Sequence, residues 1–70
     1  RAGNARAALH LLYRRPIVSA GELAKGIQVS HPTANAVIRD LVKIGVLKEI
    51  TGLQKGRVYS FEAYLRLFLM

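Results

Sequence analysis

Two closely spaced helix-start signals restrict most strongly how this chain can fold. Ser19 and Glu22 have the spacing of a capping box, in which hydroxyl and carboxylate each accept a hydrogen bond from the other residue's amide. Ser30 is a second N-cap, and Pro32 is tolerated in the first turn that follows it. Only a short helix, Ala20 to Ile27, and a tight turn fit between the two signals. Two helices joined by so short a turn are typical of the helix-turn-helix arrangement.

The segments on either side of this pair have equally clear patterns. Apolar residues at i, i+3, i+4 and i+7 predict a helix over Asn4 to Arg14, which Pro16 ends. Ile17–Val18 is then expected to be a short extended piece. The third helix is expected to run to about Ile44 and to stop at Gly45, because glycine adopts the left-handed conformation that ends many helices.

The last third of the chain favours a β-hairpin and one more helix. Val46 to Ile50 and Val58 to Phe61 are rich in β-formers, and the loop between them contains Gly52 and Gly56. Glu62 to Met70 is expected to be helical. The predicted fold class is therefore mainly α with a small β-hairpin: a winged helix-turn-helix with a three-helix core, a two-stranded wing and a C-terminal helix.

Length and charge narrow the classes of function. Seventy residues suit a single domain, 1–70, and the chain begins at Arg1, so we expect a fragment of a larger protein. A formal charge of +7 suits a polyanionic partner such as nucleic acid. The chain has no cysteine, which excludes disulfides and is compatible with the cytoplasm. No apolar run approaches the roughly 20 residues that a membrane span needs.

The third helix is divided into an apolar face and a polar face. Its apolar face, expected to be buried, consists of Ala34, Val37, Ile38, Leu41 and Ile44. The polar side has the chemistry of a recognition helix, which offers small residues and hydrogen-bond donors to a major groove. We therefore predict nucleic-acid binding by Ser30, His31, Thr33, Asn35, Ala36, Arg39 and Lys43. The alternative is an ordinary amphipathic helix with a solvated polar face.

The hairpin loop adds two cations to this prediction. Lys55 and Arg57 flank Gly56, and in a winged helix such a loop lies over the DNA backbone, where its cations bind phosphates. The alternative is a loop whose charges only keep it solvated.

No catalytic or metal site is expected. His10 and His31 lack cysteine or acidic partners at the spacing of metal ligands, and no nucleophile, base and oxyanion grouping can be assembled. We therefore predict no enzyme activity, no metal and no cofactor for this chain.

The last helix is apolar nearly all round, with Arg66 alone polar after Ala63. A small monomer has little core in which to bury such a helix. We therefore expect a contact with a second copy or with the rest of the parent protein, through Tyr64, Leu65, Phe68 and Leu69. The alternative is a helix that folds back over the first helix near Leu9 and Leu12.

Several segments together resemble the winged-helix domain found at the C-terminus of many Fic-family proteins. They are Ser30–Ala36 (SHPTANA), Leu41–Leu47 (LVKIGVL), Glu49–Gly52 (EITG), Lys55–Tyr59 (KGRVY) and Ala63–Leu65 (AYL). The first two are common to many winged helices, and the later ones are more specific. The resemblance covers most of the chain, from about Val18 to Leu67.

The resemblance implies a parent enzyme that transfers AMP from ATP to a protein hydroxyl. The family's catalytic loop is His-Pro-Phe-x-Asp/Glu-Gly-Asn-Gly-Arg. It is absent here, because no Asp-Gly-Asn-Gly-Arg sequence follows His31-Pro32. The resemblance therefore implies the fold and an accessory role, and no catalytic residue.

Two functions remain open at this point, and a third is less favoured. The first is binding of double-stranded DNA through the third helix and the wing. The second is a protein-interaction module that docks a Fic catalytic domain, a second subunit or a target. The third is a purely structural dimerisation cap, which would require that the face formed by the third helix and the wing binds no partner.

Overall fold

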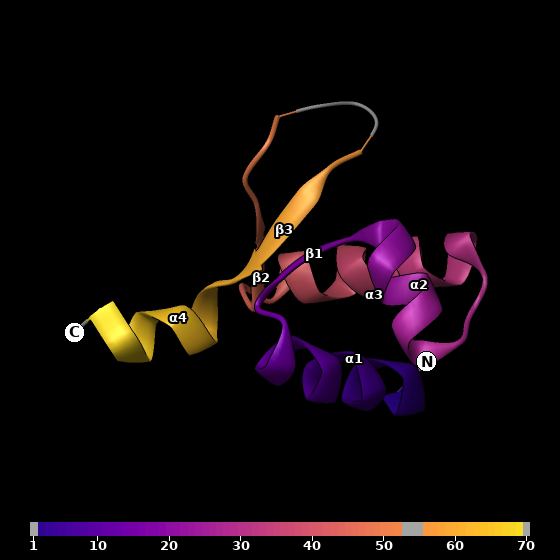
Figure 1. Ribbon diagram of the computed structural model, residues 1–70, viewed down its shortest axis with the longest axis horizontal. Helices are drawn as coiled ribbons and strands as arrows, with labels where there is room; N and C mark the ends of the chain where they lie inside the picture. Colours follow the sequence, from indigo (N-terminus) through magenta and orange to yellow (C-terminus); the bar gives the residue numbers. More distant parts are fainter. Residues whose placement is uncertain (1, 53–55, 70) are drawn as a thin grey trace.

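Four helices and three short strands make up the part of the chain that the computed structural model describes, residues 2–52 and 56–69 (Figure 1). In chain order they are α1 (Ala2–Arg14), β1 (Ile17–Ser19), α2 (Ala20–Ile27), α3 (His31–Lys43), β2 (Leu47–Glu49), β3 (Val58–Phe61) and α4 (Glu62–Leu69). The predicted helices are all present, and α1 begins two residues earlier than expected. The architecture is mainly helical with a small antiparallel sheet.

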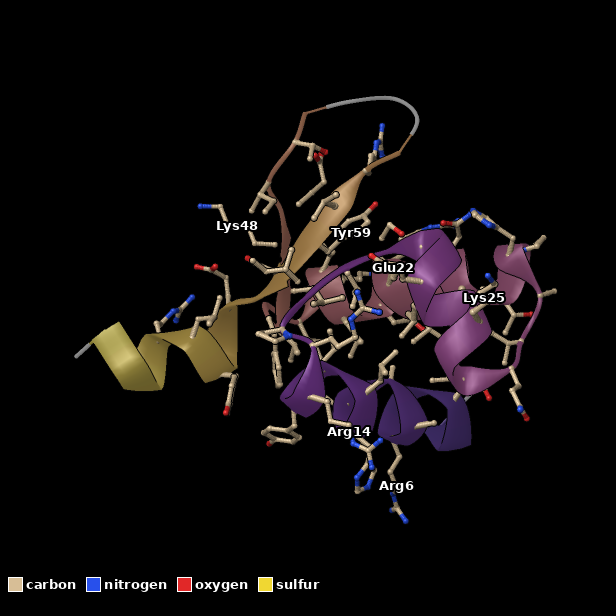
Figure 2. All side chains as sticks on the ribbon, in the orientation of Figure 1. Arg6, Arg14, Glu22, Lys25, Lys48 and Tyr59 are labelled. Carbon is tan, nitrogen blue, oxygen red and sulfur yellow. The ribbon has the colours of Figure 1, made fainter. Side chains whose placement is uncertain are left out.

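The first two helices pack closely because a glycine lies where they meet. A Cβ added at Gly26 of α2 would lie 2.6 Å from the Cδ2 atom of Leu11 on α1. Ala8 and Leu12 of α1 are fully buried. Arg6 and Arg14 project from α1 on the side away from the hairpin (Figure 2).

The predicted capping box of α2 is confirmed. Ser19 Oγ accepts from the Glu22 amide at 3.2 Å, and Glu22 Oε1 accepts from the Ser19 amide at 2.9 Å. Arg15 Nη2 also donates to Glu22 Oε2 at 2.7 Å. The start of α2 is therefore held both by its own cap and by the segment that leaves α1.

The turn between α2 and α3 and the end of α3 follow the sequence signals. Gln28 ends α2 in the left-handed region, at φ 59°. Ser30 Oγ then caps α3 by accepting from the Thr33 amide. Gly45 has a φ of 82°, as its place after the helix predicts.

The sheet has three strands, in the order β1-β3-β2. The predicted two-stranded hairpin is present as β2 and β3, and β1 adds a third strand that was not predicted. Ile17, expected to be merely extended, pairs antiparallel with Ser60 of β3, while Leu47 pairs with Phe61 on the other side. The Phe61 amide also donates a hydrogen bond, at 2.7 Å, to the carbonyl of Pro16, the residue directly before β1. The pairing of β1 with β3 joins segments that are distant in sequence, so no local turn signal predicts it.

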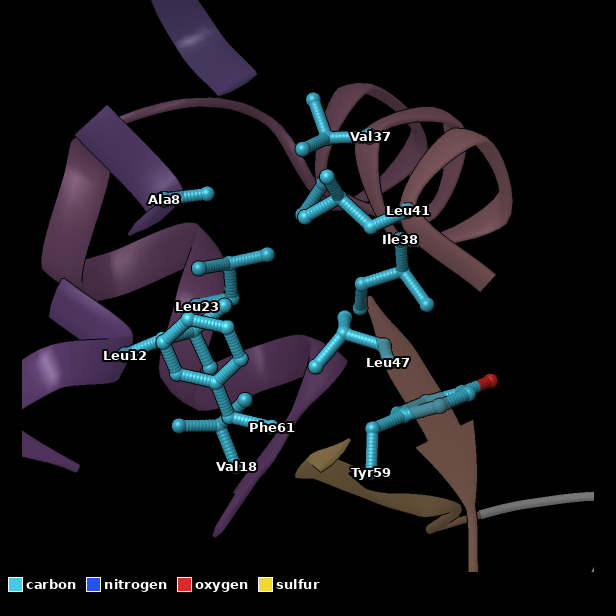
Figure 3. Packing of buried hydrophobic residues seen from close by; sticks show 11 residues of the cluster. Ala8, Leu12, Val18, Leu23, Val37, Ile38, Leu41, Leu47, Tyr59 and Phe61 are labelled. Atoms are coloured by element: carbon cyan, nitrogen blue, oxygen red, sulfur yellow. The ribbon is translucent and has the colours of Figure 1, made fainter. Parts of the chain in front are cut away.

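One cluster of buried side chains joins the three N-terminal helices to the sheet (Figure 3). Its members are Ala8, Leu12, Val18, Leu23, Ala34, Val37, Ile38, Leu41, Leu47, Tyr59 and Phe61. The predicted apolar face of α3 is confirmed at four positions and wrong at Ile44, which is 70% exposed. Ile44 follows the last residue of α3 as its C-cap, so it leaves the helical stripe.

The helix α4 leaves β3 directly and extends away from the other helices (Figure 1). Tyr64 contacts Tyr13 and Phe61, with ring centroids 5.3 and 5.5 Å away. Among the described side chains, this ring contact with α1 lies at Tyr13, near the C-terminal end of that helix. Leu65 is half-buried, and the side chains of Phe68 and Leu69 lie outside the described residues. None of the helices in the described ranges is long and apolar enough to cross a membrane.

Candidate nucleic-acid interface

A groove of about 870 Å³ runs between α3, the start of α2 and the β2–β3 hairpin. The side chains that α3 contributes are His31, Asn35, Ile38, Arg39 and Val42. The hairpin contributes Glu49, Gly56, Arg57 and Tyr59. The start of α2 contributes Ser19, Ala20 and Gly21. Residues from three separate parts of the sequence therefore form one surface.

Three of the predicted contact residues on α3 lie in this groove. His31, Asn35 and Arg39 are all exposed and follow one another along the helix at intervals of four residues. Residues at this spacing share a helix face. They offer an imidazole, a carboxamide and a guanidinium, which are groups that hydrogen-bond base edges or phosphates.

Two other predicted residues of α3 lie outside the groove. Lys43 is exposed near the end of the helix, and Ala36 is half-buried. The groove lies toward the hairpin flank of α3, because the hairpin stands beside one edge of the helix. Helical periodicity identifies the solvent side of α3 but does not indicate which flank faces a neighbouring element.

Ser30 and Thr33 are partly engaged within the protein. Ser30 Oγ accepts from the Thr33 amide at 3.3 Å and donates to Thr33 Oγ1 at 2.9 Å. The serine hydroxyl proton is therefore used by the helix cap. Both residues stand at the start of α3, where the helix dipole is positive and no acidic residue occupies the first turn.

The hairpin side of the groove contains one of the two predicted cations. Arg57, exposed and directly before β3, lines the groove. Lys55 lies outside the described residues. Tyr59 is 9% exposed: its ring belongs to the core, and its hydroxyl points away from the cluster (Figure 3).

Glu49 is the acidic member of the groove, and the sequence prediction missed it. Its pKa lies below the ordinary value, first because the Thr51 hydroxyl donates a hydrogen bond to the carboxylate. The hydrogen bond from the Gly52 amide lowers the pKa next, and desolvation by burial opposes these two effects. The Thr51 amide and the positive charge of Arg57 lower the pKa by smaller amounts. Glu49 is therefore charged at neutral pH.

The other missed residues have no distinctive local pattern. Ser19, Ala20 and Gly21 are recognisable in sequence as a helix start, and Tyr59 as a core strand residue. They reach the groove because α2 and β2 pack against α3 and β3 pairs with β2. A partial signal for this region is Thr51, since threonine hydroxyls near turns form local hydrogen bonds.

The cations of α1 form a separate group. Arg6, His10 and Arg14 are exposed, and none of them lines the groove beside α3. Substitutions of these α1 cations change the total charge and leave the groove intact. They therefore serve as controls for properties that depend on the groove. A search of the described residues finds no group of three His, Cys, Asp or Glu side chains able to hold a metal ion.

Comparison with known proteins gives no match to a family model, to a curated protein or to a solved structure.

Proposed function

We propose that this chain is a winged helix-turn-helix domain that binds double-stranded DNA through α3 and the β2–β3 hairpin. The observation that carries the proposal is that Arg39 of α3 and Arg57 of the hairpin line the same groove. A helix and a hairpin that offer cations to one surface suit a duplex, whose major groove accepts a helix while a loop follows the backbone.

The kinds of residue on α3 support this choice of partner. Arg39 matches guanine or phosphate, and Asn35 matches adenine or phosphate. Val42, which is 39% exposed, lines the same groove and suits contact with a thymine methyl group. The net charge of +7 adds a non-specific attraction that salt will weaken.

A titration of fluorescent random duplex at two salt concentrations tests this proposal. The wild-type chain is expected to bind at about 50 mM salt and to lose affinity steeply by about 200 mM. The double variant Arg39→Ala, Arg57→Ala removes two cations from the groove. The matched control is Arg6→Ala, Arg14→Ala, which removes the same charge from α1.

The two double variants separate a located site from a general effect of charge. The groove variant is expected to lose more affinity than the α1 variant. Equal losses would mean that DNA is attracted by total charge and would overturn the proposed site. The absence of binding by the wild type at low salt would overturn the function.

We also propose, on the resemblance of the segments from Ser30 to Leu65 to Fic-family C-terminal domains, that the parent protein transfers AMP to protein hydroxyls. In such a parent protein, the DNA-binding module would position the catalytic domain on DNA. Sequencing of the parent gene tests this: a His-Pro-Phe-x-Asp/Glu-Gly-Asn-Gly-Arg loop in the same reading frame is expected, and its absence would overturn the proposed parent.

A further inference from the structure

The carboxylate of Glu49 binds the first residues of the hairpin loop. Glu49 is the last residue of β2, opposite Tyr59. Its Oε2 atom accepts hydrogen bonds from the Thr51 amide and the Thr51 hydroxyl, each at 2.8 Å, and from the Gly52 amide. One carboxylate oxygen therefore fixes the backbone of the two residues through which the chain enters the loop.

The same group of hydrogen bonds reaches the returning arm of the hairpin. The Val58 amide donates to Thr51 Oγ1 at 3.3 Å, and the Ile50 amide donates to the Val58 carbonyl at 2.9 Å. Glu49 thus acts through Thr51 on the residue that directly follows Arg57. These bonds extend the connection between the arms beyond the last residue of β2.

The backbone on both sides of the loop supports this arrangement. Gly52 and Gly56 have φ values of 68° and 67°, a conformation that glycine adopts without the steric cost of a side chain. The Gly52 amide points at Glu49, and Gly56 leads directly into Arg57. The backbone at both ends of the loop therefore adopts a conformation that favours glycine.

Glu49 has two opposing effects on a DNA site. Its charge repels phosphates, so a simple electrostatic view predicts that its removal strengthens binding. Its hydrogen bonds hold the segment that carries Arg57, so the loss of these bonds predicts weaker binding. The two effects can be separated, because glutamine keeps an acceptor oxygen and loses the charge.

We propose that Glu49 is a positioning residue of the DNA-binding groove, whose hydrogen bonds to Thr51 and Gly52 hold Arg57 toward α3. The inference rests on the proposed DNA-binding function for its effect on affinity. It goes beyond that function, because it assigns a role in polyanion binding to an acidic side chain.

Duplex titrations of Glu49→Ala and Glu49→Gln test the proposal. Glu49→Ala is expected to bind roughly tenfold more weakly than wild type, the size expected for losing charge-assisted hydrogen bonds. Its salt slope should fall by about 0.9 if one phosphate contact is lost. Glu49→Gln is expected to bind at least as tightly as wild type, with an unchanged slope.

Glu62→Gln is the matched control, because it removes an acidic charge at the start of α4, away from the loop, and keeps an oxygen that can accept the hydrogen bond from the Ser60 hydroxyl. It is expected to strengthen binding slightly through the loss of its charge. If Glu49→Ala and Glu49→Gln both behave like Glu62→Gln, Glu49 acts only through its charge and the proposal is overturned. Thr51→Val is a second variant, expected to weaken binding while keeping the carboxylate, and unchanged binding by it also counts against the proposal.

A measurement on the free protein separates this inference from the proposed function. In the wild type the Gly52 amide hydrogen is expected to exchange slowly with solvent, and in Glu49→Ala it should exchange at least tenfold faster. The same exchange rate in both proteins would overturn the positioning role, whatever the DNA result. Protected Gly52 in a wild-type chain that binds no duplex would overturn the DNA function and support the loop-holding role alone.

Discussion

Arg39 on α3 and Arg57 directly before β3 line one groove, although a turn, a strand and a loop separate them in the sequence. The packing of the sheet explains this proximity. Leu47 of β2 and Phe61 of β3 are paired, and both belong to the buried cluster that includes Leu41 of α3. Because both strands pack on the core beside α3, residues of the hairpin line the same groove as residues of that helix.

The two arginines are expected to differ in what they recognise. Arg39→Ala should weaken binding to a selected preferred duplex by about 1–3 kcal/mol more than binding to random duplex, because a helix residue reads base edges. Arg57→Ala should weaken both equally, because a loop residue contacts phosphates. Competition titrations with the two duplexes measure the difference. Equal losses for Arg39→Ala would reduce Arg39 to a phosphate contact.

The core assignment predicts unequal effects of two apolar substitutions. Leu23 is fully buried, so Leu23→Ala should lower the free energy of unfolding by about 2–5 kcal/mol. Ile44 is 70% exposed, so Ile44→Ala should change it by less than about 0.5 kcal/mol. Urea unfolding followed by circular dichroism measures both. A large loss for Ile44→Ala would show that its side chain is buried in solution.

The helices were predictable because their signals are local. The caps at Ser19 and Ser30 and the glycine at 45 set helix ends through contacts within a few residues. β1 was not predictable as a strand, since three residues carry little pattern and their partners lie in β3. Tyr59, Ser60 and Phe61 are buried in succession, so the side chains on both faces of β3 are covered and alternation along this strand is imperfect.

Some of the residues that line the candidate site were predictable, but its shape and its other residues were not. Arg39, Asn35 and Arg57 follow from the pattern of a recognition helix and a glycine-rich loop. The places of Glu49 and Tyr59 in the groove depend on how the hairpin leans toward α3. That orientation is set by packing among distant residues, which a single sequence does not reveal.

Acid is expected to weaken the start of α2. The pKa of Glu22 lies below its ordinary value of 4.5, mainly because the Ser19 amide donates to its carboxylate, with a further contribution from Arg15. The stabilisation of the folded chain by the charged Glu22 carboxylate is therefore complete above pH 4.5. It is lost as the pH falls through the lowered pKa.

The variant Glu22→Gln tests this pH dependence. Its melting temperature should be lower than that of the wild type at neutral pH and should fall less between about pH 6 and about pH 3. Lys48→Gln, which changes an exposed charge but no carboxylate, should keep the wild-type profile. Identical acid profiles for Glu22→Gln and the wild type would contradict the assignment.

Self-association through α4 stays a prediction from the sequence. Burial of each Leu or Phe side chain contributes about 1.5–3 kcal/mol, so two or three on a shared surface suffice for association. We expect a dimer with Leu65, Phe68 and Leu69 at the contact. Sedimentation of the wild type should show the dimer, and a Phe68→Glu, Leu69→Glu variant should be a folded monomer.

Two results would contradict this dimer. A wild-type chain that stays monomeric at high concentration excludes it. A double variant that unfolds, instead of forming folded monomers, would mean that α4 belongs to the core through the contacts that begin at Tyr64.

The central claim is that DNA lies on the groove between α3 and the hairpin. Amide chemical shifts of the labelled chain, recorded during titration with a short duplex at low salt, test it most directly. The account predicts the largest changes at His31, Asn35, Arg39 and Arg57, with small changes at Arg6 and His10 on α1. Changes centred on α1, or none at all, would contradict it.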